Sequence, residues 1–353
     1  MIKMTCHGDD AYKYSDVIDF ASNSNPCGAS KKAVDAIRNN LDRISMYPDS
    51  DCVELCKEFA KYNNVCSENI IAGNGASEVI RLFCEVFLNK SDSVLIPSPV
   101  FSGFEANARL FCGEIKYLLL NSCDDFKINA DEVLGEINRV KNRIKVVFLC
   151  SPNNPSGQFI PKESILKILK EAPETYVFLD ESFIEFSEMD SMSSEVEKHG
   201  NLFVLRSMTK FFALAGLRVG CGVGNKNLIE ILRGAKLEWN VNFPGQVAAV
   251  ESLKDKEYIE NSKFLIKKEK QNLFNGLSLI NKLRVYPSYT NFFLVDIEKT
   301  GLKSGEMKSM LLKKNILIRD CSNFRGLSEN YIRICTRTKK ENEKLLDAIK
   351  EII

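Results

Sequence analysis

Histidine is scarce in this sequence, with only His7 and His199 among 353 residues. This scarcity argues against serine–histidine–aspartate triads and multi-histidine metal centres, so another side chain is expected to carry any chemistry. An excess of one charge is also absent, because 48 Lys and Arg balance 47 Asp and Glu for a net charge of +1. The sequence therefore predicts neither nucleic acid nor a membrane surface as a partner.

Long apolar segments are lacking too. No stretch approaches the roughly 18 uninterrupted apolar residues of a membrane-spanning helix, and residues 1–5 lack the apolar core of a signal peptide. The twelve cysteines are scattered without a CxxC pair, and no histidine lies near Cys52 and Cys56 to complete a zinc site. We expect no metal, mostly buried reduced thiols and a cytoplasmic location.

Short apolar runs alternate with helix-length segments in the middle of the chain. We expect strands at 70–72, 93–97, 144–150, 176–179 and 202–205. This alternation is typical of an α/β domain with a mostly parallel sheet flanked by helices, which binds ligands at the carboxyl ends of its strands. A chain of this length also favours a second domain.

The two ends of the chain have a different pattern. Residues 1–40 predict an extended arm and a helix at 31–41, with part of a small domain. After the large domain at 41–245, residues 246–353 predict a smaller α+β domain. It begins with one long helix at 246–277 and contains strands near 292–295 and 331–334.

Residues 206–220, RSMTKFFALAGLRVG, place Lys210 directly after an expected strand. A lysine in a partly apolar loop loses its proton readily and condenses with an aldehyde. Ser207 and Thr209 precede it, and Arg218 follows eight residues later. Two hydroxyls and a forked guanidinium can together hold a phosphate dianion. The segment thus favours an imine-forming lysine beside a phosphate site.

This segment resembles the corresponding one of fold type I pyridoxal-phosphate (PLP) enzymes of the aminotransferase class I/II superfamily, and the resemblance runs through almost the whole chain. The family's lysine at the position of Lys210 holds PLP as a Schiff base. Phe101 matches the aromatic that stacks on the pyridine ring, Asn154 the donor to its 3-oxygen, and Asp180 the carboxylate at its nitrogen. Singly these would be a core aromatic, a turn residue and a loop acid, but their order favours PLP.

The resemblance also implies how the cofactor phosphate is bound. Gly75, Ala76 and Ser77 open an expected helix, whose positive end would attract the phosphate together with Ser207, Thr209 and Arg218. Tyr47 matches a tyrosine that reaches the phosphate of the neighbouring subunit. It implies a homodimer with a shared active site; alternatively, Tyr47 is an ordinary turn residue before Pro48.

Arginines near the end of the chain suggest the substrate. Arg333 matches the family arginine that binds an α-carboxylate, and Arg319 matches one that binds the substrate phosphate in histidinol-phosphate aminotransferases. Arg337 is expected on the same strand face as Arg333. Three such arginines would select a small phosphorylated amino compound with two anionic groups, although each alone would be a common surface residue. Asn25 and His7 are further substrate-binding candidates, and His7 is alternatively only part of the terminal arm.

Two branches of the superfamily are similar to this chain. Residues 152–155 and 214–218 resemble histidinol-phosphate aminotransferases, which transaminate with 2-oxoglutarate and glutamate. Residues 319–324 resemble L-threonine-O-3-phosphate decarboxylases of cobalamin synthesis, as does Phe183, where most aminotransferases have a tyrosine that donates to the 3-oxygen. Its absence predicts an imine that keeps its proton to higher pH. Both reactions stay open at this point; a PLP-binding protein without turnover is a third possibility, disfavoured because no segment remains for a DNA-binding domain.

Overall fold

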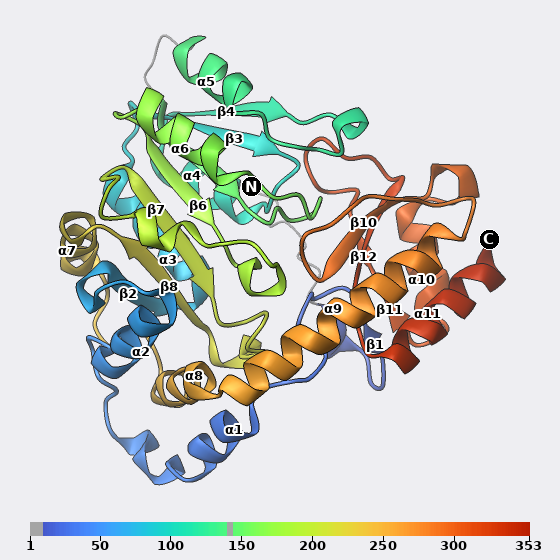
Figure 1. Ribbon diagram of the computed structural model, residues 1–353, viewed down its shortest axis with the longest axis horizontal. Coiled ribbons are helices and arrows are strands. Elements are labelled where there is room, and N and C mark those ends of the chain that lie inside the picture. The colour runs from blue at the N-terminus through green and yellow to red at the C-terminus, as the bar shows by residue number, and fades with distance from the viewer. Residues whose placement is uncertain (1–9, 140–143) are drawn as a thin grey trace.

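The computed structural model describes residues 10–139 and 144–353 (Figure 1). Its centre is a seven-stranded sheet in the order β2-β8-β7-β6-β5-β3-β4, in which only β8 runs antiparallel to its neighbours. The strands are β2 (Ile70–Asn74), β3 (Ser93–Ser98), β4 (Glu114–Leu119), β5 (Ile144–Cys150), β6 (Tyr176–Asp180), β7 (Leu202–Ser207) and β8 (Val219–Gly224). A mostly parallel sheet flanked by helices was expected, and it is confirmed.

Both faces of this sheet are buried, which explains the nearly continuous apolar strands. Phe148, Phe178 and Phe203 lie opposite one another on β5, β6 and β7 and point to the face covered by α3 (Gly75–Phe87), α4 (Gly103–Phe111) and α7 (Lys226–Ala235). The residue that follows each phenylalanine along its strand points to the opposite face of the sheet and packs in a second hydrophobic core. That face is covered by α2 (Val53–Asn63), α5 (Ala130–Arg139), α6 (Lys162–Glu171) and α8 (Phe243–Lys254).

A second, four-stranded antiparallel sheet has the order β12-β13-β10-β9. Its strands are β9 (Arg284–Val285), β10 (Phe292–Asp296), β12 (Arg319–Asp320) and β13 (Tyr331–Cys335). It lies with α10 (Ser304–Leu312) and α11 (Lys339–Ile352) at one side of the molecule, and α9 (Lys256–Ser278) runs from α8 to this side (Figure 1). The N-terminal strand β1 (Ile18–Asp19) pairs with β11 (Ile316–Leu317), so the arm joins this C-terminal part.

Three features differ from the sequence-based expectations. The long helix expected from 246 is two helices, α8 and α9, separated at Asp255, whose carboxylate instead accepts a hydrogen bond from Ser30 at 2.5 Å. The first helix, α1 (Lys31–Arg38), ends three residues early. Strands β4 and β8 of the large sheet were missed, as were the two-residue strands β1, β9, β11 and β12. Strand β8 contains three glycines, which have low strand propensity. Gly220 is required there because a Cβ would lie 2.4 Å from the Ala76 amide nitrogen.

None of the helices among the described residues is long and apolar enough to cross a membrane. The cysteines of the described segments are free thiols, most of them buried.

Candidate active site

A cavity of about 550 Å³ lies between the two sheets, at the carboxyl ends of β5, β6 and β7. Residues 21–24 of the N-terminal segment also contribute to its lining. One side, here called the large-sheet wall, comprises Ala76, Ser77, Phe101, Asn154, Asp180, Ser207, Thr209, Lys210 and Arg218. The other, the small-sheet wall, comprises Arg319, Asn323, Phe324 and Arg333.

Lys210 follows the end of β7 and points into this cavity. Its Nζ donates to the carbonyl oxygen of Ser22 at 2.8 Å, and its own carbonyl accepts from the backbone amide of Asn25 at 3.0 Å. Burial, reinforced by the positive charge of Arg333, lowers the pKa of Lys210 to about 8. Burial therefore increases the fraction of this amine that is neutral, and nucleophilic, near neutral pH.

Asp180 is the last residue of β6 and also lines the cavity. Burial raises the pKa of its carboxyl group to about 6, although the Ser182 side chain and amide oppose the shift. The amide donates to Oδ1 at 2.8 Å. Among the described residues no basic side chain forms an ion pair with Asp180, so a cation entering the cavity would find a buried carboxylate to pair with.

The hydroxyl and guanidinium groups expected to bind phosphate are brought together. Ser207 Oγ and Thr209 Oγ1 are 2.7 Å apart, and both line the cavity with Ser77. The Arg218 guanidinium comes so close to Gly75 that a Cβ at that position would lie 2.3 Å from it. Gly75 also has φ +77°, which favours glycine. This arrangement, at the N-terminus of α3, fits a phosphate dianion.

Phe101 and Asn154 lie on the same wall. The Phe101 ring covers Gly103, where a Cβ would come within 2.2 Å of it. Asn154 follows β5, and its Oδ1 accepts a hydrogen bond from Arg333 of the opposite wall. Asn154 thereby links the two sheets across the cavity.

Arg319 and Arg333 are direct partners in the β12–β13 pairing. Arg333 Nη2 donates to the Ala21 carbonyl at 2.6 Å, and burial lowers the pKa of its guanidinium to about 10. Arg319 Nη2 donates to Asn323 Oδ1 at 2.8 Å. Two cations side by side in a buried cavity favour a ligand with two negative charges.

Two predicted substrate residues do not reach the cavity. Arg337 lies beyond the end of β13 at Cys335, and its guanidinium pairs with Glu341 at 3.0 Å. The strand alternation assumed for it stops too early. The side-chain amide of Asn25 points into the protein. Its Nδ2 donates to the Phe211 carbonyl at 2.9 Å and to Ser262 Oγ at 2.9 Å. Neither residue lines the cavity, so their part in substrate binding stays a prediction; Asn25 fastens the arm to the Lys210 loop.

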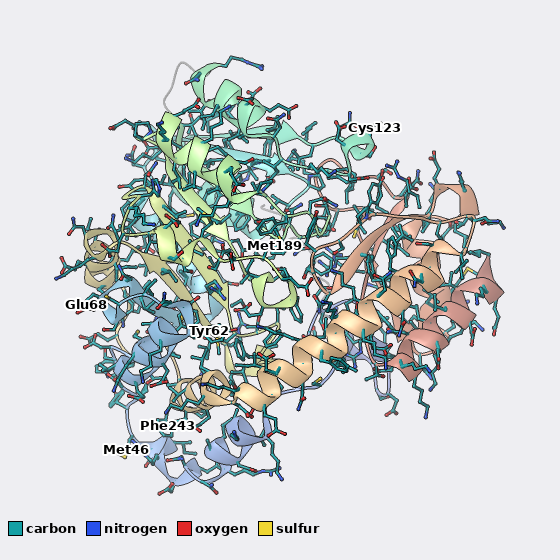
Figure 2. The ribbon with its side chains drawn as sticks, in the orientation of Figure 1. Met46, Tyr62, Glu68, Cys123, Met189 and Phe243 are labelled. Carbon is teal, nitrogen blue, oxygen red and sulfur yellow. The ribbon has the colours of Figure 1, made fainter. Side chains whose placement is uncertain are left out.

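Tyr47 is not among the residues that line this cavity. Tyr47 is 80% exposed and lies on Trp239, with ring centroids 4.7 Å apart. Met46 and Phe243 lie at the same edge of the molecule (Figure 2). The role of Tyr47 in a neighbouring subunit stays a prediction, and His7 lies outside the described residues.

Several residues that line the cavity were not predicted to be site residues. Asn23 is buried with φ 59°, and its Oδ1 has no hydrogen-bond partner among the described residues. Asn323 and Phe324 come from the loop after β12. An asparagine in the turn before Pro26 was the only available signal for Asn23. Phe183 also lines the cavity and packs edge-on against Phe292, with centroids 5.1 Å apart.

The sequence profile of the family "Aminotransferase class I and II" matches residues 15–349. The chain therefore belongs to this family, whose enzymes are PLP-dependent aminotransferases. The expected class is confirmed.

Individual relatives narrow the comparison. A histidinol-phosphate aminotransferase of Methanococcus aeolicus is 36% identical over 340 residues, which cover 96% of this chain and 90% of that one. The crystal structure of the Clostridium acetobutylicum histidinol-phosphate aminotransferase has a TM-score of 0.87 at 33% identity and covers 95% of this chain and 99% of its own. L-Threonine-O-3-phosphate decarboxylase from Porphyromonas gingivalis has a TM-score of 0.83 at 26% identity, with the same coverage.

Proposed function

We propose that this protein binds PLP at Lys210 and transfers the amino group of histidinol phosphate to 2-oxoglutarate, giving glutamate. The observation that carries this proposal is the side-by-side placement of Arg319 and Arg333 across the cavity from Lys210. The relatives named histidinol-phosphate aminotransferases, 30–36% identical over nearly the whole chain, support the same choice.

The large-sheet wall fits the cofactor. Ser77, Ser207, Thr209 and Arg218 would hold its phosphate, and buried Asp180, without a cationic partner among the described residues, would pair with its ring nitrogen. PLP, when bound, supplies an aldehyde for the amine and a ring that accepts an electron pair. Lys210, whose pKa burial lowers to about 8, would hold the cofactor through its aldehyde carbon and would move the proton at the substrate's α-carbon.

The small-sheet wall fits both substrates of a transamination. Histidinol phosphate carries a phosphate dianion, and 2-oxoglutarate and glutamate carry two carboxylates. Arg319 and Arg333, held in adjacent register, match either pair of charges by forked hydrogen bonds. Since the two substrates occupy the site in turn, one anion-binding subsite suffices for both halves of the reaction.

The test is an assay of the PLP-loaded protein with histidinol phosphate and 2-oxoglutarate. We expect glutamate to form catalytically and the cofactor to convert to its pyridoxamine form when histidinol phosphate is added alone. No conversion with histidinol phosphate, combined with carbon dioxide release from L-threonine-O-3-phosphate, would overturn the proposal. No reaction with either compound would point to a binding protein without turnover.

Decarboxylation of L-threonine-O-3-phosphate is the second candidate, and Phe183 favours it. Phe183 lines the cavity without a hydroxyl to donate to the cofactor. However, the decarboxylase of known structure is less similar than the aminotransferases, at 26% identity. The assay above distinguishes the two reactions directly.

We also propose that the protein is a homodimer whose subunits share active sites. The exposed apolar residues near Tyr47 support it: Leu41, Ile44, Met46, Leu237 and Trp239 are all at least 46% exposed. Mixing the inactive variants Lys210→Ala and Tyr47→Ala, with subunit exchange, should restore activity because one hybrid site is intact. A lack of restoration despite exchange would contradict sharing.

A further inference from the structure

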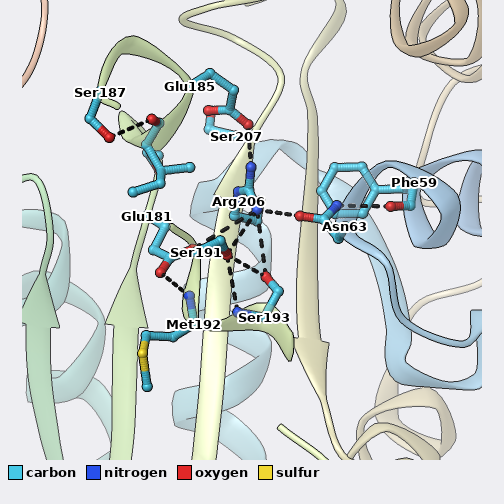
Figure 3. Close-up of polar contacts among 12 residues, drawn as sticks. Phe59, Asn63, Glu181, Glu185, Ser187, Ser191, Met192, Ser193, Arg206 and Ser207 are labelled. Atoms are coloured by element: carbon cyan, nitrogen blue, oxygen red, sulfur yellow. Dashed lines mark hydrogen bonds and ion pairs between the residues drawn. The ribbon is translucent and has the colours of Figure 1, made fainter. Parts of the chain in front are cut away.

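Behind the large-sheet wall lies a buried charged cluster that does not contact the cavity (Figure 3). Arg206, the penultimate residue of β7, pairs with Glu185 at 2.5 Å and lies 3.9 Å from Glu181. All three residues are at most 5% exposed. Charges buried this deeply are costly unless they are paired, and Glu185 forms the direct ion pair with Arg206, whereas burial raises the pKa of Glu181.

Neutral groups also contact the cluster, although Glu185 Oε2 and Arg206 Nε have no hydrogen-bond partner among the described residues. The Arg206 guanidinium donates to the Asn63 side chain at the end of α2 and to Ser191 Oγ at 3.2 Å. Glu181 in turn accepts from the Ser191 hydroxyl and from the Met192 amide, the latter at 2.8 Å. The cluster thus joins β7 to α2, to the segment after β6 and to residues 191–193 (Figure 3).

Two members of this cluster are direct chain neighbours of cavity residues. Glu181 follows Asp180, and Arg206 precedes Ser207. Alternation along the chain turns Asp180 and Ser207 into the cavity and their neighbours away from it. The Glu181 amide also donates to the Leu205 carbonyl at 2.9 Å, extending the β6–β7 pairing past Asp180.

We propose that Arg206, held by Glu185 and Glu181, is a positioning residue that fixes the distance between the Asp180 carboxylate and the phosphate-binding hydroxyls of Ser207 and Thr209. This inference rests on the proposed use of PLP, whose ring nitrogen and phosphate would be held by these groups. Because the cofactor is rigid, both contacts form well only when the ends of β6 and β7 keep one spacing.

Two conservative variants test this role. Arg206→Lys keeps the charge but loses the forked contacts, and Glu185→Gln keeps the shape but loses the charge. We expect each variant to bind PLP more weakly, with a dissociation constant about tenfold higher than that of the wild-type protein. The absorbance of bound PLP should also titrate at higher pH, because weaker contact with Asp180 leaves less positive charge on the ring.

Thr175→Val is the matched control. Thr175, immediately before β6 at its opposite end, is buried and donates to the Ile144 carbonyl at 2.8 Å, so its loss destabilises the same strand far from the cavity. At an equal fall in melting temperature, the control should leave PLP binding and the absorbance titration unchanged. Equal effects in all three variants, or unchanged binding in Arg206→Lys, would overturn the positioning role. Failure of the wild-type protein to bind PLP would instead overturn the proposed function.

Discussion

The two walls of the cavity are built in different ways. The large-sheet wall takes its polar groups from strand ends and a helix N-terminus, each at a short distance in sequence from a buried strand. The small-sheet wall depends on the pairing of two short strands and on the loop between them, residues 321–330. A rigid cofactor site and a more adaptable substrate site follow, because long parallel strands fix positions better than a loop does.

The largest expected effect is the loss of activity on replacing Lys210, compared with replacing a second lysine whose pKa is similarly lowered. Burial lowers the pKa of both Lys210 and Lys270 to about 8, but only Lys210 lines the cavity. We expect Lys210→Ala to reduce kcat by more than about a thousandfold, because nucleophile and proton shuttle are both lost. Lys270→Ala, the control, should retain nearly full activity. Comparable losses in the two variants would mean that position in the cavity is not decisive.

The small-sheet wall should govern substrate affinity. We expect Arg333→Met and Arg319→Met each to raise KM for glutamate or histidinol phosphate by about tenfold to a hundredfold, since a hydrogen-bonded charge pair is lost. PLP affinity should change much less. Arg337→Met is the control, because its guanidinium pairs with Glu341 outside the cavity. Steady-state kinetics measure the change in KM, and PLP titration measures cofactor affinity. A large rise in KM for Arg337→Met would indicate that Arg337 also binds the substrate.

The large-sheet wall predicts a pH window for PLP capture by the apoprotein. Lys210 reacts only when neutral, so the rate should rise about tenfold per pH unit up to pH 8 and then level off. Affinity should weaken below about pH 6, where Asp180 is protonated before a cation reaches it. Rapid-mixing absorbance measurements give the rate. A flat rate between pH 6 and 8 would contradict the role assigned to Lys210 burial.

Phe183 offers a change within the cofactor site itself. Phe183→Tyr adds a hydroxyl to the cavity lining, which can donate beside Asn154 to the cofactor's 3-oxygen. Such a donor stabilises the unprotonated form of the cofactor bound at Lys210. We expect the absorbance titration to move downward by about one pH unit. An unchanged midpoint would show that the ring does not face the 3-oxygen.

The smallest expected effect concerns the contact between the walls. Arg325, in the loop after β12, reaches Glu105 on α4 at 3.1 Å and stacks over Tyr117, 3.9 Å from the ring centroid. We expect Arg325→Ala to raise KM by about threefold, as is typical of partly exposed ion pairs, with kcat little changed. Arg109→Ala is the control because it pairs with the same carboxylate from within α4. Equal effects would mean that the contact of Arg325 with Glu105 makes no contribution of its own to substrate binding.

Most of the large-sheet wall was predictable from the sequence. Lys210, Asp180 and Asn154 each follow an apolar run that is long enough to be a buried strand. Parallel strands bring their carboxyl ends to one edge, so the strand pattern predicted that these positions meet, while the resemblance to the family singled out Asp180 and Asn154. The alternation of β8 was hidden by its glycines, and that strand was missed.

The small-sheet wall was predictable only in part. Arg319 and Arg333 lie opposite each other because β12 and β13 pair in one register, which no local pattern reveals. The positions of Arg337 and Asn25 were equally hidden, since Arg337 pairs with Glu341 of α11 and the Asn25 side chain donates to Ser262 of α9. The sequence by itself determined the parallel sheet, the lysine and its phosphate-binding neighbours, because these depend on periodicity and short spacings. Only the tertiary structure decided which arginines and asparagines face the cavity, because burial and hydrogen bonding between distant segments select one orientation for each side chain.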